Sequence, residues 1–193
     1  MKIYISGKIT GLQFREVKDK FQVAQNFLED LGLAVVNPVN NGLTLNDTWE
    51  QHMIKDIAEL FSCEAIYMLD NWMESLGSSI EYDIAKRMGK KIFFESDVVT
   101  KFNLVTKIKD VIHEISGLKF SEYTSESRKR NCFYARMLFA HKCNENGMKI
   151  EDISELIQRD RTTVLYVLNK YDDEVKYNPE FRRLVEKFNE IIK

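Results

Sequence analysis

Residues 70–81 place a carboxylate at each end of a serine-bearing loop. Asp70 follows an apolar run, Ser75 lies in the loop, and Glu81 falls in the first turn of a predicted helix. A loop that opens into a helix N-terminus offers unpaired N–H groups to an anion, and ligands of open α/β sheets bind beyond the carboxyl ends of the strands. This stretch is therefore a candidate site for an anionic ligand with carboxylates beside it.

A helix cap is the alternative interpretation of the same stretch. Ser78 and Glu81 have the S-x-x-E spacing of a capping box. In that motif both side chains satisfy N–H groups at the start of a helix, which contributes about 1 kcal/mol. Spacing alone leaves both roles open for Glu81.

The elements that would position this loop alternate between strands and helices. Short apolar runs at residues 2–5, 33–36, 65–69 and 91–94 are typical of strands, and the third is apolar on both faces, as in a central parallel strand. The segments between them carry apolar residues at helical spacing. We therefore predict an α/β fold for residues 1–98, a three-layer domain with a Rossmann-like or flavodoxin-like parallel sheet.

Two polar loops are predicted at the same edge of that sheet. The loop from Ser6 to Gly11 follows the first strand, and its glycines allow a tight turn and close approach of the backbone to a ligand. The loop 39–46 is polar and lies at the edge of the expected site. The helix after it is predicted to begin with a capping box formed by Asp47 and Glu50.

Asp56 is a further candidate functional carboxylate. It lies beside core positions of the helix predicted over residues 49–60, which is unusual for a solvated charge. A surface or capping charge is the alternative role.

The second half of the chain is predicted to be entirely helical. The polar stretch 95–101 interrupts the apolar pattern, so we expect a second, all-α domain over residues 102–193. Within it, two short helices joined by a tight turn fit a helix-turn-helix. Its second helix would follow an N-cap at Asp160 and present residues 161–163 to DNA bases. A three-helix bundle with a solvated charged surface is the alternative.

Charge divides unevenly along the chain, whose net charge is -2. Residues 1–102 hold 11 basic and 15 acidic side chains, a balance of -4, whereas residues 103–193 hold 17 and 15, a balance of +2. The second half is therefore the better candidate for a polyanionic partner.

Composition also restricts the compartment and the chemistry. Three cysteines without a C-x-x-C pair favour reduced thiols in a cytoplasmic protein, and no apolar stretch approaches the roughly 20 residues that span a bilayer. His52, His113 and His141 show no metal-ligand spacing, so we expect neither a metal nor a cofactor. The lack of a G-x-S-x-G motif argues against a Ser-His-Asp hydrolase.

Three segments of the first half resemble the nucleoside 2-deoxyribosyltransferase superfamily, which includes the 2′-deoxynucleoside 5′-phosphate N-hydrolases and the bacterial and phage branch known as DUF4406. The segments are YISGKITG at Tyr4–Gly11, DIAELFSCEAIYMLD at Asp56–Asp70 and SLGSSIEYDIA at Ser75–Ala85. The resemblance implies three catalytic carboxylates, Glu81, Asp56 and Asp70. It also implies a substrate-binding set that comprises Tyr4, Ser6, Gly7, Lys8, Ser75, Gly77 and Ser78.

This residue set suits the cleavage of an N-glycosidic bond in a deoxynucleoside or deoxynucleotide. Positive charge develops at C1′, which a carboxylate stabilises or traps covalently while a second acid protonates the departing base. The resemblance implies Glu81 as nucleophile or electrostatic stabiliser, and Asp56 or Asp70 as the acid. Lys8 replaces a small hydroxyl residue of the hydrolases and Asp70 is more similar to the transferases, so hydrolysis and base transfer both stay open. Shared active sites in the superfamily imply a homodimer.

The second half resembles the C-terminal DNA-binding domain, domain IV, of the replication initiator DnaA. The resemblance runs from about Phe102 to Tyr171 through SRKRNCFYARMLFAHK and ISELIQRDRTTVLYVLNK, and it implies double-stranded DNA as a partner. No G-x-x-x-x-G-K-[ST] motif of an ATPase is present, and Arg161 replaces a histidine of the family. The implied base-facing residues are Asp160, Arg161 and Thr162, and the other implied DNA-binding residues are Arg128, Lys129, Arg130, Arg159 and Thr163.

The leading hypothesis couples cleavage or transfer at an N-glycosidic bond to sequence-specific binding of double-stranded DNA. The alternative keeps both folds without catalysis, as a nucleotide-sensing DNA-binding regulator. A third hypothesis is that the helical domain binds protein, since its net positive charge is small.

Overall fold

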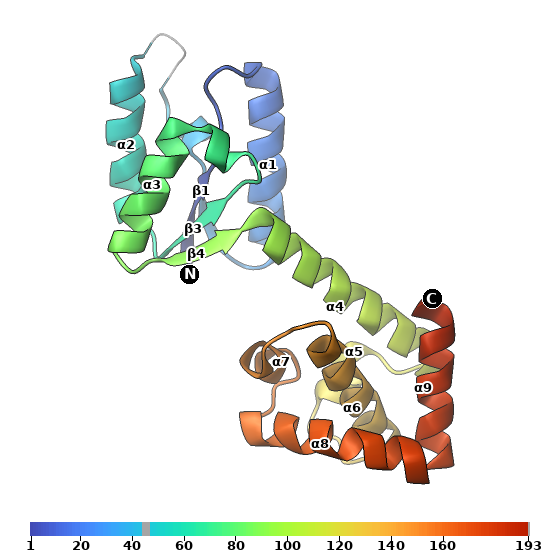
Figure 1. Cartoon of the computed structure of the whole chain (residues 1–193). Helices are drawn as coiled ribbons and strands as arrows, with labels where there is room; N and C mark the ends of the chain where they lie inside the picture. Colours follow the sequence, from blue (N-terminus) through green and yellow to red (C-terminus); the bar gives the residue numbers. More distant parts are fainter. Residues whose placement is uncertain (44–46, 193) are drawn as a thin grey trace. The chain divides into compact units, whose positions relative to one another are not determined.

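The computed structural model describes residues 1–43 and 47–192 of the chain. It divides into two compact units, Met1–Val99 and Thr100–Lys193, here called the α/β unit and the helical unit (Figure 1). Part of the predicted polar loop 39–46 lies outside the described residues.

The α/β unit contains a parallel sheet of four strands within the described residues, in the order β2-β1-β3-β4. The prediction of an α/β fold followed by an all-helical half is therefore confirmed. The elements follow one another as β1 (Lys2–Ser6), α1 (Phe14–Asp30), β2 (Ala34–Val36), η1 (Pro38–Asn40), α2 (Trp49–Phe61), β3 (Ala65–Met68), η2 (Trp72–Glu74), α3 (Leu76–Arg87) and β4 (Lys91–Phe94).

Helices cover both faces of this sheet (Figure 1). Side chains alternate along a strand, so Ile3 and Ile5 of β1 pack with the apolar face of α1. Tyr4 points to the opposite face, where it packs with Leu60 of α2 and Ala85 of α3. The same alternation places Ser6 on the face of Tyr4, directed at α2 and α3. The two apolar layers thus fix which β1 side chains face the candidate site.

The predicted cap of α2 was wrong by one residue, and the capping role that the sequence left open for Ser78 and Glu81 does not hold. α2 begins at Trp49, so its capping box is formed by Thr48 and Gln51, which exchange hydrogen bonds of 2.7 and 3.3 Å, rather than by Asp47 and Glu50. α3 begins at Leu76. The predicted cap formed by Ser78 and Glu81 therefore lies inside the helix.

Ser75 caps α3 in place of Ser78. Its Oγ accepts a hydrogen bond of 3.3 Å from the Ser78 N–H, as an N-cap serine does. Because the helix starts five residues before Glu81, the Glu81 side chain has no capping role and is directed at the sheet.

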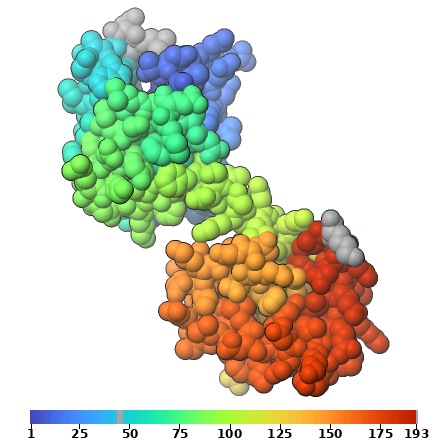
Figure 2. Space-filling model, viewed as in Figure 1, coloured from blue at the N-terminus to red at the C-terminus, as the bar shows by residue number. Residues whose placement is uncertain are grey.

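The helical unit is built around α6. It comprises most of α4 (Glu95–Ser116), followed by α5 (Phe120–Thr124), α6 (Arg130–Glu145), α7 (Ile150–Leu156), α8 (Arg161–Tyr177) and α9 (Pro179–Ile192). Leu138 and Phe139 of α6 are fully buried in a core that also holds Val164 of α8 and Phe181 of α9. Figure 2 shows a face of this unit made up largely of the orange to red atoms of α7, α8 and α9.

The polar stretch 95–101 is helical, and the division between the two units falls within it, between Val99 and Thr100. α4 begins at Glu95, directly after β4, because this segment contains neither proline nor glycine and its first turn is capped from outside. The Ser96 N–H donates to Asp70 Oδ1 at 3.1 Å. Across the described ranges, no helix is long and apolar enough to cross a bilayer.

Candidate functional site

A cavity of about 360 Å³ lies at the carboxyl end of β1. The loop after β1, the segment after β2, the helix α2 and the first turn of α3 form its walls. It brings together eight of the ten residues predicted for catalysis or substrate binding, namely Tyr4, Ser6, Gly7, Asp56, Ser75, Gly77, Ser78 and Glu81.

Glu81 is held by two hydroxyl groups from β1. The Tyr4 hydroxyl donates to Oε1 at 2.7 Å, and the Ser6 hydroxyl donates to Oε2 at 2.5 Å. All three side chains are buried, and Glu81 is only 4% exposed. The carboxylate is therefore fixed in orientation, since each of its oxygens has a donor of its own.

Burial raises the pKa of Glu81 to about 7, because the charged form loses its hydration. The hydrogen bonds from Ser6 and Tyr4 oppose this rise, while the negative charge of Asp56 adds to it. Burial also raises the pKa of Tyr4 well above its usual value, so its hydroxyl stays a donor. Glu81 is thus a carboxyl group that changes charge near neutral pH.

Asp56 supplies a second buried carboxyl group to the cavity. It is 7% exposed, and burial raises its pKa to about 6, against the opposing effect of a hydrogen bond from Asn41. The Asn41 side-chain amide donates to Asp56 Oδ1 at 2.9 Å. Two carboxyl groups with raised pKa values in one cavity are typical of acid–base catalysis.

The first turn of α3 forms a wall of the cavity through Ser75, Gly77 and Ser78. Helix N-termini attract anions because their N–H groups point outwards and the helix dipole is positive there. A Cβ at Gly77 would lie 3.1 Å from Met53 Sδ of α2, and one at Gly7 would lie 2.7 Å from Leu69 Cδ1. Both glycines thus allow close packing around the cavity.

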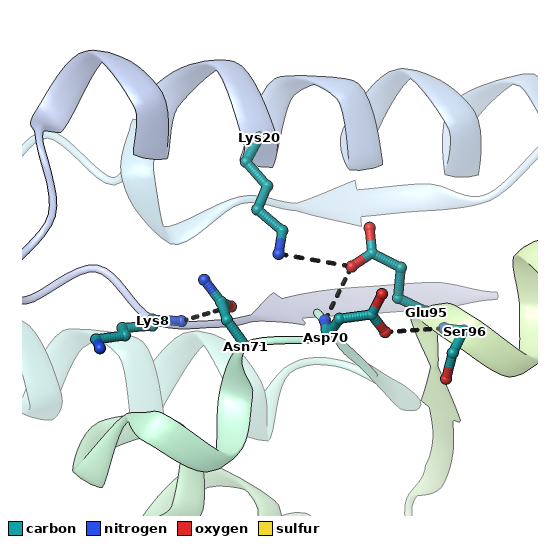
Figure 3. A network of polar contacts seen from close by, with 6 residues as sticks. All are labelled: Lys8, Lys20, Asp70, Asn71, Glu95 and Ser96. Carbon is teal, nitrogen blue, oxygen red and sulfur yellow. Dashed lines mark hydrogen bonds and ion pairs between the residues drawn. The ribbon is translucent and has the colours of Figure 1, made fainter.

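Asp70 and Lys8 are the two predicted site residues that do not line the cavity. Asp70 is exposed, and its carboxylate caps α4 at Ser96 while its N–H donates to Glu95 Oε2 at 2.9 Å (Figure 3). The reason is topological, because β3 neighbours β4 and α4 begins directly after β4. Asp70 therefore meets α4 rather than Glu81.

Lys8 turns towards the loop that follows β3. Its ammonium group lies 2.8 Å from Glu74 Oε2, and its N–H donates to Asn71 Oδ1 at 3.1 Å (Figure 3). The cation is thus engaged outside the cavity, so the geometry does not support its predicted place in the substrate-binding set.

Several cavity residues had not been singled out from the sequence. Asn41, His52, Phe14 and Trp49 all line the cavity. Asn41 belongs to the polar loop that was predicted at the edge of the site, and this polarity was the available signal. Phe14 and Trp49 are apolar residues at helix starts, and no sequence pattern separates such residues from core positions.

The helical unit presents the second candidate site at the start of α8. Asp160 caps this helix as predicted, and its Oδ1 accepts hydrogen bonds from the Thr163 N–H and the Thr162 hydroxyl, each at 2.6 Å. Arg161 is exposed and forms an ion pair of 3.3 Å with Glu151 of α7. Arg161 and Thr162 thus lie at the exposed end of a helix, where recognition helices contact base edges.

Buried Arg136 holds the loop before α6 against this region. Its guanidinium donates to the carbonyl oxygens of Ser125 and Ser127 at 3.1 and 3.0 Å, and half-buried Arg159 donates to the same Ser125 oxygen. Arg159 therefore links the loop before α6 to the turn before α8 through a structural hydrogen bond. Arg128 and Lys129 at the end of this loop and Arg130 at the start of α6 are exposed.

No metal site is found among the described residues. Nowhere in residues 1–43 and 47–192 do three or more histidine, cysteine, aspartate or glutamate side chains lie close enough to hold a metal ion together.

Comparison with known proteins divides the chain in the same way as the structure. Residues 1–94 match the family model described as a domain of unknown function, DUF4406, and residues 105–170 match the model described as the bacterial dnaA protein helix-turn-helix. The predicted DUF4406-like and DnaA-like halves are therefore confirmed as similarities. These matches do not address deoxyribosyl transfer or N-hydrolysis, which stay predictions.

One curated relative is the chromosomal replication initiator protein DnaA of Lachnoclostridium phytofermentans, with 29% identity over 96 residues. The alignment covers 47% of this chain and 21% of the relative. The chain therefore spans about a fifth of the length of the curated relative that it matches.

Glu81→Gln is expected to stabilise the α/β unit above neutral pH. The folded state holds the proton of Glu81 more tightly than the unfolded state, so stability falls as pH rises between 4.5 and about 7. A rise in pKa from 4.5 to about 7 corresponds to a loss of roughly 3 kcal/mol across that range. Glutamine keeps the shape without the charge. Its amide oxygen accepts from one hydroxyl and its amide NH2 donates to the oxygen of the other, so the variant loses no stability through ionisation of this group.

Urea unfolding between pH 5 and pH 8 measures this difference. Both tryptophans, Trp49 and Trp72, lie in the α/β unit, so their fluorescence reports on that unit alone. Asp83→Asn removes an exposed carboxylate of the same helix and serves as the control. A stability difference between Glu81→Gln and the parent protein that does not change with pH would contradict the assignment.

Proposed function

We propose that the α/β unit cleaves the N-glycosidic bond of a 2′-deoxynucleoside or its 5′-phosphate, and that the helical unit binds double-stranded DNA. The observation that carries the first part is the buried Glu81 carboxylate, fixed by Tyr4 and Ser6 at a cavity that also contains the carboxyl group of Asp56. A buried pair of carboxyl groups with raised pKa values supports chemistry that needs one ionised and one protonated partner.

In the proposed reaction Glu81 acts in its ionised form and Asp56 in its acid form. The Glu81 carboxylate stabilises the positive charge at C1′ or forms a bond to it while the C1′–N bond breaks. The electron pair of that bond goes to the base, and the proton of Asp56 neutralises the base as it leaves. Water, or a second base in a transferase, then attacks C1′, which breaks any bond to Glu81, and the nucleophile gives its proton to the Asp56 carboxylate.

The first turn of α3 supports binding of a 5′-phosphate. Ser75, Gly77 and Ser78 line the cavity at a helix N-terminus, where both N–H groups and hydroxyls favour an anion. The cavity of about 360 Å³ falls within the size range of small-molecule sites. We leave Asp70 and Lys8 out of the proposed substrate site because neither lines the cavity.

DNA binding is supported by the helix-turn-helix match and by the exposed positions of the basic residues. Arg161 and Thr162 lie at the N-terminus of α8 as base-reading candidates. Exposed Arg128 and Lys129 are the phosphate-binding candidates, because phosphate contacts position a protein on the duplex without reading sequence.

A homodimer is supported by apolar side chains beside the cavity. Ile54 of α2 and Leu76 of α3 are 71% and 70% exposed. Ile54 follows Met53 in the sequence and Leu76 precedes Gly77. Met53 and Gly77 both line the cavity, where the two helices pack closely. Exposed apolar groups near a site favour a protein contact there.

A nucleotide-sensing regulator without catalysis is the second candidate, and the polar network of Figure 3 favours it. The loop after β3 leads into Ser75 of the cavity, and its residue Asp70 bonds to Glu95 and Ser96 at the start of α4. α4 continues into the helical unit. A ligand that changes the loop can therefore change the first turn of α4.

Release of a free base is the expected result when the full chain is incubated with a panel of deoxynucleosides and deoxynucleoside monophosphates. Chromatography with and without a second free base separates hydrolysis from transfer. Glu81→Gln is expected to lower kcat by about 10²-fold or more, because it removes the charge that meets C1′, whereas Asp83→Asn is expected to retain activity. Full activity in Glu81→Gln would overturn the catalytic assignment, and a bound nucleotide recovered intact would favour the sensor.

The pH dependence of kcat/KM is expected to be bell-shaped with a maximum between pH 6 and pH 7. Activity needs ionised Glu81 and protonated Asp56. Because the pKa of Glu81 is about 7 and that of Asp56 about 6, this is the less populated of the two singly protonated forms, and both limbs of the profile belong to the coupled pair. Asp56→Asn is expected to remove the alkaline limb while leaving the acid limb. Measuring the pH profile of kcat/KM on both a deoxynucleoside and its monophosphate distinguishes the ionisation of enzyme groups from that of the substrate phosphate, because only the second substrate carries a phosphate. An unchanged alkaline limb in Asp56→Asn would exclude Asp56 as the acid.

Binding to random-sequence duplex DNA is expected to weaken steeply with salt. Lys129→Ala is expected to weaken all duplexes similarly and to reduce the slope of log K against log salt by about 0.9. Arg161→Ala is expected to change which sequences are selected and to cost about 1–3 kcal/mol on preferred sites. Lys107→Ala, an exposed cation on α4, is the control. Salt-insensitive binding, or no binding to any duplex, would contradict the proposal.

A further inference from the structure

An open groove of about 660 Å³ lies in the helical unit, away from the start of α8. It is formed where the end of α4, the start of α6, the turn between α8 and α9, and one side of α9 meet. Its lining includes Ile115, Arg130, Tyr177, Glu180, Arg183 and Lys187. Arg183 and Lys187 lie on α9, beyond the part of the chain that matches the helix-turn-helix model.

The groove carries an excess of positive charge. Three cations line it against one carboxylate, Glu180. Within the described residues Arg130, Arg183 and Lys187 form no ion pair, so their charges are not neutralised by neighbours. The first turn of α6 begins at Arg130 without a side-chain cap, which adds the positive end of a helix dipole. The groove is therefore complementary to a polyanion.

An exposed aromatic ring adjoins these cations. The Tyr177 side chain is 71% exposed, and the Lys176 ammonium lies 4.9 Å from its ring centroid. The Asn178 side chain bonds to the Tyr134 hydroxyl, which fixes the turn beside the ring against α6. Cationic grooves that track a backbone, with aromatic rings on which unpaired bases stack, are typical of single-stranded nucleic acid sites.

The groove lies at the opposite end of α8 from the base-reading candidates. α8 contains 17 residues, so its first and last residues are about 25 Å apart at 1.5 Å per residue. A base pair in a duplex cannot stack on a protein ring, because both faces of its bases are occupied by neighbouring pairs. The exposed ring of Tyr177 thus favours unpaired bases over the duplex that Arg161 would contact.

We propose that this groove binds single-stranded DNA, with Arg130, Arg183 and Lys187 on the phosphates and Tyr177 stacked on a base. The helical unit then has two nucleic-acid surfaces, one for duplex at the start of α8 and one for a single strand at its end. Glu180 opposes binding by charge repulsion, so it limits the affinity of the groove.

Fluorescence anisotropy of the full chain with labelled 15-nucleotide oligothymidylate tests the proposal. Arg183→Glu combined with Lys187→Glu is expected to weaken binding at least tenfold, and Arg183→Ala combined with Lys187→Ala to reduce the salt slope by about 1.4. Tyr177→Ala is expected to weaken binding roughly fivefold or more through lost stacking. Glu180→Gln is expected to strengthen it. These α9 positions and Tyr177 are exposed, so the substitutions leave the core intact.

Three comparisons decide between the groove and other surfaces. Lys107→Glu, a charge reversal elsewhere on the helical unit, is expected to bind the oligonucleotide within twofold of the parent protein. Arg161→Ala is expected to weaken duplex binding and leave oligothymidylate binding unchanged. An abasic oligonucleotide of equal length is expected to bind several-fold more weakly than oligothymidylate.

Any of three results would overturn the proposal. The first is unchanged oligothymidylate binding in the double charge reversal. The second is equal weakening of duplex and single-strand binding by Arg161→Ala, which would place both ligands on the start of α8. The third is that an acidic peptide of equal charge binds as tightly as the oligonucleotide and depends on the same residues. That result would make the groove a docking site for acidic protein segments.

Discussion

The buried Glu81 carboxylate is the constraint on which the α/β unit depends. A charge removed from water is costly unless it is paired or hydrogen-bonded, and here two hydroxyls of β1, those of Tyr4 and Ser6, donate to the two carboxylate oxygens. Their positions follow from the two-residue period of the strand, which sends Tyr4 and Ser6 to one face and Ile3 and Ile5 to the other. Because the apolar side chains pack against α1, the register of β1 cannot shift without exposing them, and Glu81 keeps both donors.

The raised pKa values of Glu81 and Asp56 mean that burying these carboxylates in their charged form lowers the stability of the α/β unit. A sheet edge built only for stability would pair such carboxylates with cations, yet Lys8 is engaged by Glu74 outside the cavity and Lys20 lies 3.8 Å from Glu95. The cations near this edge therefore stabilise the loop after β3 and the start of α4. They do not pair with the two cavity carboxyl groups, whose pKa values stay close to neutral pH. Sites that break a local rule for stability are where function is expected.

The helical unit uses charge differently, because its basic side chains are exposed at two separate places. Arg161 lies at the start of α8. Arg183 and Lys187 line the groove at the other end of that helix together with Arg130, which directly follows Arg128 and Lys129. A net charge close to neutral thus coexists with local groups of exposed cations, and local charge influences association with a polyanion more than the sum does. Buried Arg136 has a structural role instead, since it holds backbone carbonyl groups of the loop before α6.

Sequence alone determined the fold class, the strands and most helices, because hydrophobic periodicity reports directly on burial. The residues that line the cavity around Glu81 were named from the resemblance to a known family rather than from periodicity. The sequence misplaced the cap at Asp47 and could not decide between a cap and a site for Ser78 and Glu81, since helix ends depend on one or two hydrogen bonds that similar residues nearby can also make. It also grouped Asp70 with Glu81. Only the tertiary structure separated them, because the order of strands places the end of β3 beside α4 and the end of β1 beside α3. The pKa values and the α9 groove likewise depend on packing between distant segments, which no local pattern contains.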